Sequence, residues 1–252
     1  IAPKVFYKKS IIELEYIETQ ISIFSLIKNQ IISSKLKFST KAIFLKDLIT
    51  FAKVITNKPE LFILERAVKN GQIIVDVDLD FDETGKIKND YKIKAILKDG
   101  KIGLLKKYNF EKINFSLIVR NNIFSFKDLS FTNSKSSFFS ENIKIIKNKK
   151  DYFVEGQINN KDTNLSKELL KILNINISNI EFSNTNFNSD NKFSFLIDKN
   201  FKVKNLALDS NIQINKSDYK IPNIFNGFFN IKNNTIKIKE HNIKSNYKNN
   251  NL

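Results

Sequence analysis

The sequence predicts a mainly β chain, an antiparallel meander with two or three short helices. Apolar and polar residues alternate with a period of two in one segment after another, which is typical of half-buried strands. Turn residues separate these segments, and the strand starts are about 8–14 residues apart, too close for βαβ units. A hydrophobic content of 41%, with 12% aromatic residues, excludes an intrinsically disordered chain.

The clearest alternation begins where four aspartates, at 76, 78, 80 and 82, stand between apolar residues. The next apolar series alternates with Lys92, Lys94 and Lys98, and two further series follow. Apolar residues of one series share a face of their strand, so these faces together predict one long apolar surface. Its members are Val75, Val77, Leu79, Phe81, Tyr91, Ile93, Leu97, Ile113, Phe115, Leu117, Val119, Phe124 and Phe126.

Four short polar segments predict the turns between these strands. Asn70-Gly71 is a strong signal for a type I′ hairpin, because both residues tolerate positive φ. Glu83–Lys86, Asp99-Gly100 and Asn121-Asn122 predict three more turns.

Helical periodicity interrupts the strands. Apolar residues between Leu45 and Ile55 follow the i, i+3, i+4 rule, and Asn57-Lys58-Pro59 ends this helix. A second stripe spans Leu165–Leu173 after a capping candidate at Asn164, and Ser22–Lys28 predicts a brief helical turn. We expect these helices to pack on their own sheet.

The chain divides into four parts on this basis. Residues 1–58 form an N-terminal region of strands and short helices, and residues 59–162 form a first meander. Residues 163–240 add a helix and a second meander, and residues 241–252 form a polar tail that we expect to fray. Because the sequence starts at Ile1 and contains no Met, we expect it to be a piece of a longer reading frame.

The net charge of +16 allows a nucleic-acid partner, but the kind of basic residue disfavours it. Only Arg66 and Arg120 are arginines among the 42 basic residues, whereas nucleic-acid sites depend on the bidentate guanidinium group. The lysines are spread over every segment, as on a solvated surface. They also favour weak attraction to anionic lipid headgroups.

The residues for catalysis are largely missing, so we expect no enzyme and no cofactor. The single histidine, His241, lies in the polar tail, and there is no cysteine and no glycine-rich phosphate loop. The four aspartates resemble the start of a calcium loop, but Glu83 stands where such a loop needs glycine. A surface of carboxylates facing the lysines of the next strand is the preferred interpretation, with calcium as the alternative.

Alternation alone leaves two architectures open. The apolar faces could close on each other as a β-sandwich or barrel, or they could form an open groove.

The sequence also resembles the AsmA-like family in several places. Leu14–Ile27 and Ile31–Leu45 are similar to the strand, short helix and strand that lie near the membrane anchor of that family, with Ser39-Thr40 in place of the usual proline. The openings Asn70–Ile73, Asp82–Ile87 and Asp99–Ile102 resemble its "nG-x-i" strand openings, and Leu206–Ile214 resembles its "l-x-l-x-x-n-I-x-i" pattern.

This resemblance implies an elongated, curved β-sheet or groove in the periplasm of a Gram-negative bacterium. It implies an anchor in the inner membrane outside this segment and a role in phospholipid transport toward the outer membrane. The apolar surface would then contact the acyl chains of phospholipid, with no catalytic residue, no metal and no nucleic acid. The alternative is a structural or adhesive envelope module without lipid transfer, and a basic nucleic-acid-binding protein ranks below both.

Overall fold

The computed structural model of the chain describes residues 3–7, 10–21, 33–56, 59–88, 90–104, 108–133, 136–148, 151–165, 181–200, 202–220 and 235–249. The strands of the N-terminal half are β1 (Lys4–Tyr7), β2 (Ser10–Ile21), β3 (Ser33–Thr40), β4 (Ile43–Phe44), β5 (Val68–Asp80), β6 (Lys92–Leu104) and β7 (Tyr108–Arg120). Those of the C-terminal half are β8 (Ile123–Asn133), β9 (Ser136–Lys147), β10 (Tyr152–Asn164), β11 (Glu181–Ile197), β12 (Val203–Lys220) and β13 (Thr235–Asn249). The helices are α2 (Leu45–Thr56) and α3 (Pro59–Ala67).

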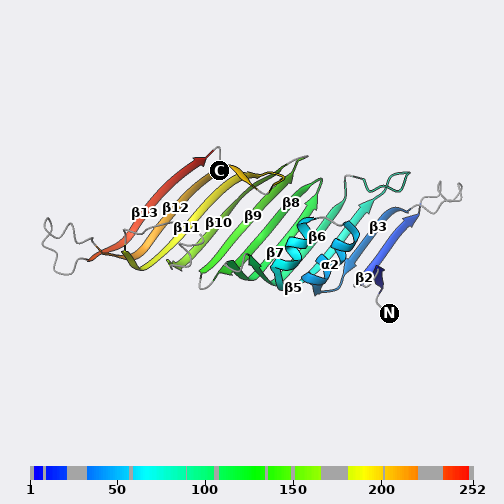
Figure 1. The fold of residues 1–252 in the computed structure, drawn as a ribbon, viewed down its shortest axis with the longest axis horizontal. Coiled ribbons are helices and arrows are strands. Elements are labelled where there is room, and N and C mark those ends of the chain that lie inside the picture. The colour runs from blue at the N-terminus through cyan, green and yellow to red at the C-terminus, as the bar shows by residue number, and fades with distance from the viewer. Residues whose placement is uncertain are drawn as a thin grey trace.

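The strands form one open antiparallel sheet in which strand order follows chain order. Each strand pairs with its neighbours in sequence from β1 to β13, except that the short β4 pairs with β5 beside β3. β1 and β13 are therefore the two edges, and Figure 1 shows the sheet as one elongated layer with β2 near one end and β13 at the other. The mainly β, antiparallel meander expected from the sequence is confirmed, and the described strands form this open sheet in place of a closed sandwich.

Two of the predicted turns are confirmed. Asn121 and Asn122 join β7 to β8 with φ of 50° and 62°, the positive values that a type I′ turn needs. In the turn that follows β5, Gly85 has φ of 78°, and the Asp82 Oδ1 accepts hydrogen bonds from the backbone N–H groups of Thr84 and Lys86.

The other two predicted turns are wrong. Asn70-Gly71 lies inside β5 and Asp99-Gly100 lies inside β6, and the pairing of β5 with β6 and of β6 with β7 changes register at these positions. Each is a β-bulge, in which a residue with positive φ is inserted into a continuing strand. A bulge and a hairpin turn need the same backbone conformation, so the two share one sequence signal.

The first predicted helix is confirmed as α2. Asp47 in its first turn and Lys53 in its last turn complement the helix dipole. A further helix, α3, follows directly, and the Thr50 hydroxyl of α2 donates a hydrogen bond of 2.9 Å to the Glu65 carboxylate of α3. Both helices lie on one face of the sheet near β5 (Figure 1).

The expected fraying of the polar tail is wrong for residues 241–249, because they continue β13. His241 pairs in register with Ile214, and Lys248 pairs with Ala207. Residues 250–252, the predicted helix at 166–173 and the helical turn at 22–28 lie outside the described residues. Within the described part, no helix is long and apolar enough to cross a membrane.

Candidate functional site

The register of the sheet separates two faces, an apolar face and a polar face. Residues that pair directly across two strands point to the same side, and neighbours in sequence point to opposite sides. Val75 pairs with Ala95 on the apolar face, whereas the next residue along β5, Asp76, pairs with Lys94 on the polar face.

Two rows of cross-strand neighbours run over the apolar face, and we name them together the apolar lane. The first row consists of Val77, Ile93, Val119, Phe124, Ile145, Val154 and Phe195. The second row consists of Val75, Ala95, Leu117, Phe126, Ile143, Gly156, Phe193 and Leu208. The first row crosses seven strands, from β5 to β11, and at about 4.8 Å per strand it is about 29 Å long.

The N-terminal end of the apolar face is a closed core. Ile73, Val75, Ala95, Leu97 and Ile113 form a buried cluster, and Leu97 is only 1% exposed. The side chains that pack on this cluster from α2 and from the strand before it are Ile43, Leu45 and Leu48. Three of the predicted lipid-contact residues, Val75, Leu97 and Ile113, therefore belong to this core.

From β7 onward, the lane lies on strands that the described helices do not cover. The described helices pack mainly on β2, β4, β5 and β6, whereas the lane continues to β12. Its side chains on β8, β9 and β11 are half-buried. Of the predicted residues, Leu117, Val119, Phe124 and Phe126 lie on this part of the lane, and Phe115 contacts Phe126 edge to face at 5.1 Å between ring centroids.

Two predicted residues lie outside the strands. Phe81 forms an isolated bridge with Ile87 beyond the end of β5, and Tyr91 precedes β6. The Tyr91 hydroxyl donates to the Asn122 Oδ1 at 3.3 Å, so this side chain presents a polar end at the border of the apolar face. Leu79 pairs with Leu36 of β3, one step beyond the first row.

Buried polar residues border the lane on β9–β12. Ser140, Asn160, Ser189 and Ser210 are buried, and all are uncharged. The Ser189 hydroxyl donates to the Asn160 Oδ1, and the Asn191 amide donates to the Ser189 hydroxyl at 2.7 Å. These groups limit the width of the apolar surface in the C-terminal half.

The aspartates of β5 lie on the polar face with the lysines of both neighbouring strands. Asp76 and Asp78 pair in register with Lys94 and Lys92. Asp78 is 3.5 Å from the Lys35 ammonium, and Asp76 accepts a hydrogen bond of 2.6 Å from the Ser39 hydroxyl. Among the described residues no group of three or more acidic or histidine side chains could hold a metal ion.

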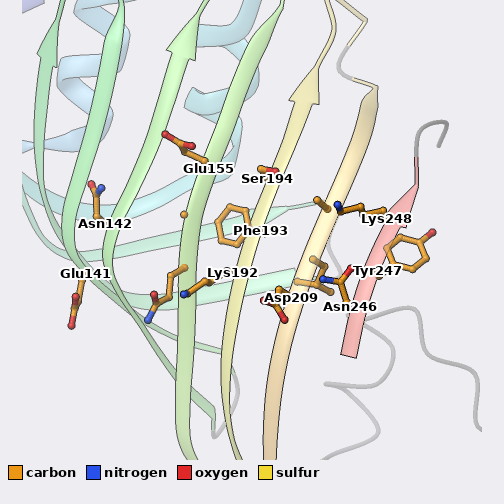
Figure 2. Close-up of a pocket in the computed structure, with 14 residues that line it drawn as sticks. Glu141, Asn142, Glu155, Lys192, Phe193, Ser194, Asp209, Asn246, Tyr247 and Lys248 are labelled. Atoms are coloured by element: carbon orange, nitrogen blue, oxygen red, sulfur yellow. The ribbon is translucent and has the colours of Figure 1, made fainter. Parts of the chain in front are cut away.

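A hollow of about 530 Å³ crosses β9–β13 (Figure 2). Its lining includes Glu155, Ser194, Lys192 and Asp209. The register places all four side chains on the polar face, and Glu155 is within 3.6 Å of the Lys144 ammonium. The hollow is therefore lined by charges of both signs, and its lining also includes Gly156, Phe193 and Leu208 from the second row of the lane.

The C-terminal half of the lane was missing from the predicted contact residues. Ile143, Ile145 and Phe193 each belong to an alternating segment, but only the register shows that they continue the rows of β5–β8. Gly156 carries no apolar signal at all. It belongs to the lane because Ile143 and Phe193 flank it in the second row.

The geometry defines a class of protein, a single-layer β-meander with an apolar lane on one face and a mixed-charge surface on the other. No protein-family model, no curated protein and no solved structure matches the chain.

Proposed function

We propose that this chain is a lipid-handling segment of an AsmA-like envelope protein that assists phospholipid transport between the inner and outer membranes of a Gram-negative bacterium. The apolar lane is the observation that supports the proposal most strongly. It is continuous over seven strands, it lies on one side of a single layer, and the described helices pack on its N-terminal end.

The dimensions of the lane suit an acyl chain. Its length of about 29 Å is close to the hydrocarbon thickness of a bilayer, about 30 Å, which holds two acyl chains end to end. Each methylene that leaves water for the lane contributes about 0.8 kcal/mol. On β8, β9 and β11 every residue of the lane is Phe or Ile, and these side chains offer this contact without any buried charge.

Polar and basic groups at the border of the lane favour a ligand with a polar headgroup, such as a phospholipid, over a fully apolar one. Tyr91 and Tyr152 place aromatic rings with a polar end near one border, and the Lys147 ammonium lies 5.9 Å from the centroid of the Tyr152 ring. Aromatic and lysine side chains of this kind match the boundary between acyl chains and headgroups. The net charge of +16 adds attraction to anionic headgroups.

The proposal includes a periplasmic location, an inner-membrane anchor outside this segment and no catalytic residue. The histidine His241 is exposed on β13, opposite Ile214. A fusion of the full-length protein to a reporter that is active only in the periplasm is expected to be active, and an inactive fusion in a sound reporter strain would contradict the location.

Two measurements test lipid contact. Mass spectrometry of an organic extract of the native protein is expected to recover phospholipid. In addition, benzoylphenylalanine in place of Phe126 is expected to crosslink lipid on illumination, because Phe126 lies in the lane. The matched control places the same photo-crosslinking residue at Ser125, its neighbour on the polar face.

An extract without phospholipid, or equal crosslinking at positions 125 and 126, would contradict the proposal. In that case, the structural or adhesive module becomes the better description of the chain.

A further inference from the structure

The edge strand β13 has one side without a partner strand in the described part of the chain. β13 is 15 residues long and pairs with β12 on its other side, from Thr235 to Asn249. A long edge strand presents a row of backbone N–H and C=O groups that can pair with another strand. Within the described residues no strand pairs with this side, and residues 236–248 are exposed apart from the half-buried Ile238.

The two faces of β13 differ in chemistry. Lys237, Lys239, Lys244 and Lys248 lie on the polar face, and all four are exposed. Ile236, Ile243 and Tyr247 lie on the apolar face and are 45%, 40% and 44% exposed. Tyr247 pairs with Leu208 and thereby extends the second row of the apolar lane to the edge.

Inside the sheet, two lysines of the polar face lie close to carboxylates of a neighbouring strand. Lys35 lies 3.5 Å from Asp78, and Lys144 lies 3.6 Å from Glu155. Within the described residues the four β13 lysines make no ion pair, although Lys237 pairs in register with Asp218. The partners of the other three are not acidic: Lys216 for Lys239, Asn211 for Lys244 and Ala207 for Lys248. A strand on the open side would bring carboxylates to Lys239, Lys244 and Lys248.

We propose that the edge of β13 is a docking site for an extended segment in which apolar and acidic residues alternate, and that this segment joins the sheet as a further strand. Its apolar residues would continue the second row of the lane beyond Tyr247 and would lie beside Ile243. Its carboxylates would face the lysines, as the aspartates of β5 face Lys92 and Lys94. This inference does not depend on lipid binding.

The same charges argue against a second copy of β13 as the occupant. Two antiparallel β13 strands related by a twofold axis would place the lysines of both on one surface, and like charges across a strand pair are destabilising. An edge rich in lysine therefore pairs poorly with a second copy of itself and well with an acidic strand.

A peptide from the chain itself provides the probe. A labelled peptide with the sequence of residues 73–82 alternates apolar residues with aspartate, and the comparison peptide has its four aspartates replaced by lysine. Fluorescence anisotropy with the full chain is expected to show binding of the acidic peptide that weakens as salt is added. The lysine peptide is expected to bind at least about tenfold more weakly.

Matched variants locate the site. Lys239→Glu with Lys244→Glu reverses two edge charges whose cross-strand partners, Lys216 and Asn211, are not acidic. Lys98→Glu with Lys127→Glu reverses two exposed charges of the polar face on interior strands. The edge variant is expected to bind the acidic peptide about tenfold or more weakly than the wild-type chain and to bind the lysine peptide more tightly. The interior variant is expected to keep the wild-type affinities for both peptides.

Circular dichroism confirms that both variants are folded before binding is measured. The proposal is overturned if neither peptide binds the wild-type chain, if both variants lose the acidic peptide equally, or if sedimentation shows that two chains associate through β13.

Discussion

Gly156 keeps the apolar lane continuous at the point where β9, β10 and β11 meet. A methyl group on its Cα would lie 2.9 Å from the Ile143 Cγ1 and 3.1 Å from the carbonyl oxygen of Asn142. Both distances are below ordinary van der Waals contact, and the second involves backbone that cannot rotate away. The Ile143 side chain and the backbone of β9 therefore cover this glycine.

We expect Gly156→Ala to destabilise the protein by about 1–3 kcal/mol, the usual cost of overpacking. Urea denaturation monitored by circular dichroism measures the change. Gly103→Ala is the control, because a methyl group there meets the side-chain oxygen of Asn109 at 3.2 Å and the flexible end of Lys69 at 3.6 Å. Equal losses of stability in the two variants would contradict the close packing of Gly156.

Non-glycine residues with positive φ occur inside the long strands. They are Asp99, Lys112, Asp128, Asp162, Asn184, Asn205 and Glu240. Asp and Asn tolerate this conformation better than other side chains, so five of the strands follow the known preference. Bulges bend a strand and increase its twist, and their presence in strand after strand contributes to the twisted shape of the sheet.

Lys112 has a φ of 51°, a backbone conformation that lysine rarely adopts. We expect Lys112→Gly to stabilise the protein by about 0.5–1 kcal/mol, because glycine adopts positive φ without a steric penalty. The urea midpoint measures the change. In the control, Lys98→Gly places glycine in β6 at a residue without positive φ, and a loss of stability is expected there; a lower midpoint for Lys112→Gly would contradict the argument.

At the scale of elements, two turns share one construction. In each, an aspartate accepts backbone hydrogen bonds from residues two and four positions later: Asp82 from Thr84 and Lys86, and Asp198 from Asn200 and Lys202. The backbone N–H of Lys202, and after it the Lys204 ammonium, lowers the pKa of Asp198 from 3.8 to about 2. The charged carboxylate therefore holds the turn between β11 and β12.

This lowered pKa predicts a pH dependence of stability. Since the folded pKa lies below the unfolded one, the carboxylate contributes stability that is fully present above about pH 4 and is lost as the pH falls through about 2. Asp198→Asn is expected to lower the urea midpoint at pH 6 but not at pH 2. Asp209→Asn, an exposed carboxylate within β12, is the control, and a constant difference from wild type at both pH values would contradict the prediction.

The helices and turns show which elements the sequence predicts. The stripe at Leu45–Ile55 predicts α2 because its apolar residues repeat with the helical period. α3 was missed because Pro59 was interpreted as the end of a helix, whereas proline also favours the first turn of the next one. The end of β13 was missed for another reason, since the bulge at Glu240 shifts the alternation by one residue between Ile238 and Ile243.

At the scale of the whole molecule, the sequence predicts which residues share a face but not which strands become neighbours in which register. Val77 and Phe195 belong to one row only because six consecutive pairings align them. Each bulge changes the register by a residue, and bulges carry the same signal as turns. The N-terminal half of the candidate site could therefore be predicted from alternation, whereas its continuation to β11 and its closure by α2 could not.

A meander of this kind has contacts mainly between consecutive strands, so its stability resembles that of a linear array. The buried cluster at β5–β7 lies far from β13, which packs on β12. Deleting residues 221–252 is therefore expected to leave the amide hydrogen-exchange protection of β5–β7 unchanged. In the control, Leu97→Ala opens a cavity in the buried cluster and is expected to lower that protection by about 2–5 kcal/mol. Loss of protection in β5–β7 after the deletion would show that the sheet folds as one cooperative unit, and the C-terminal edge would then be part of the stable core.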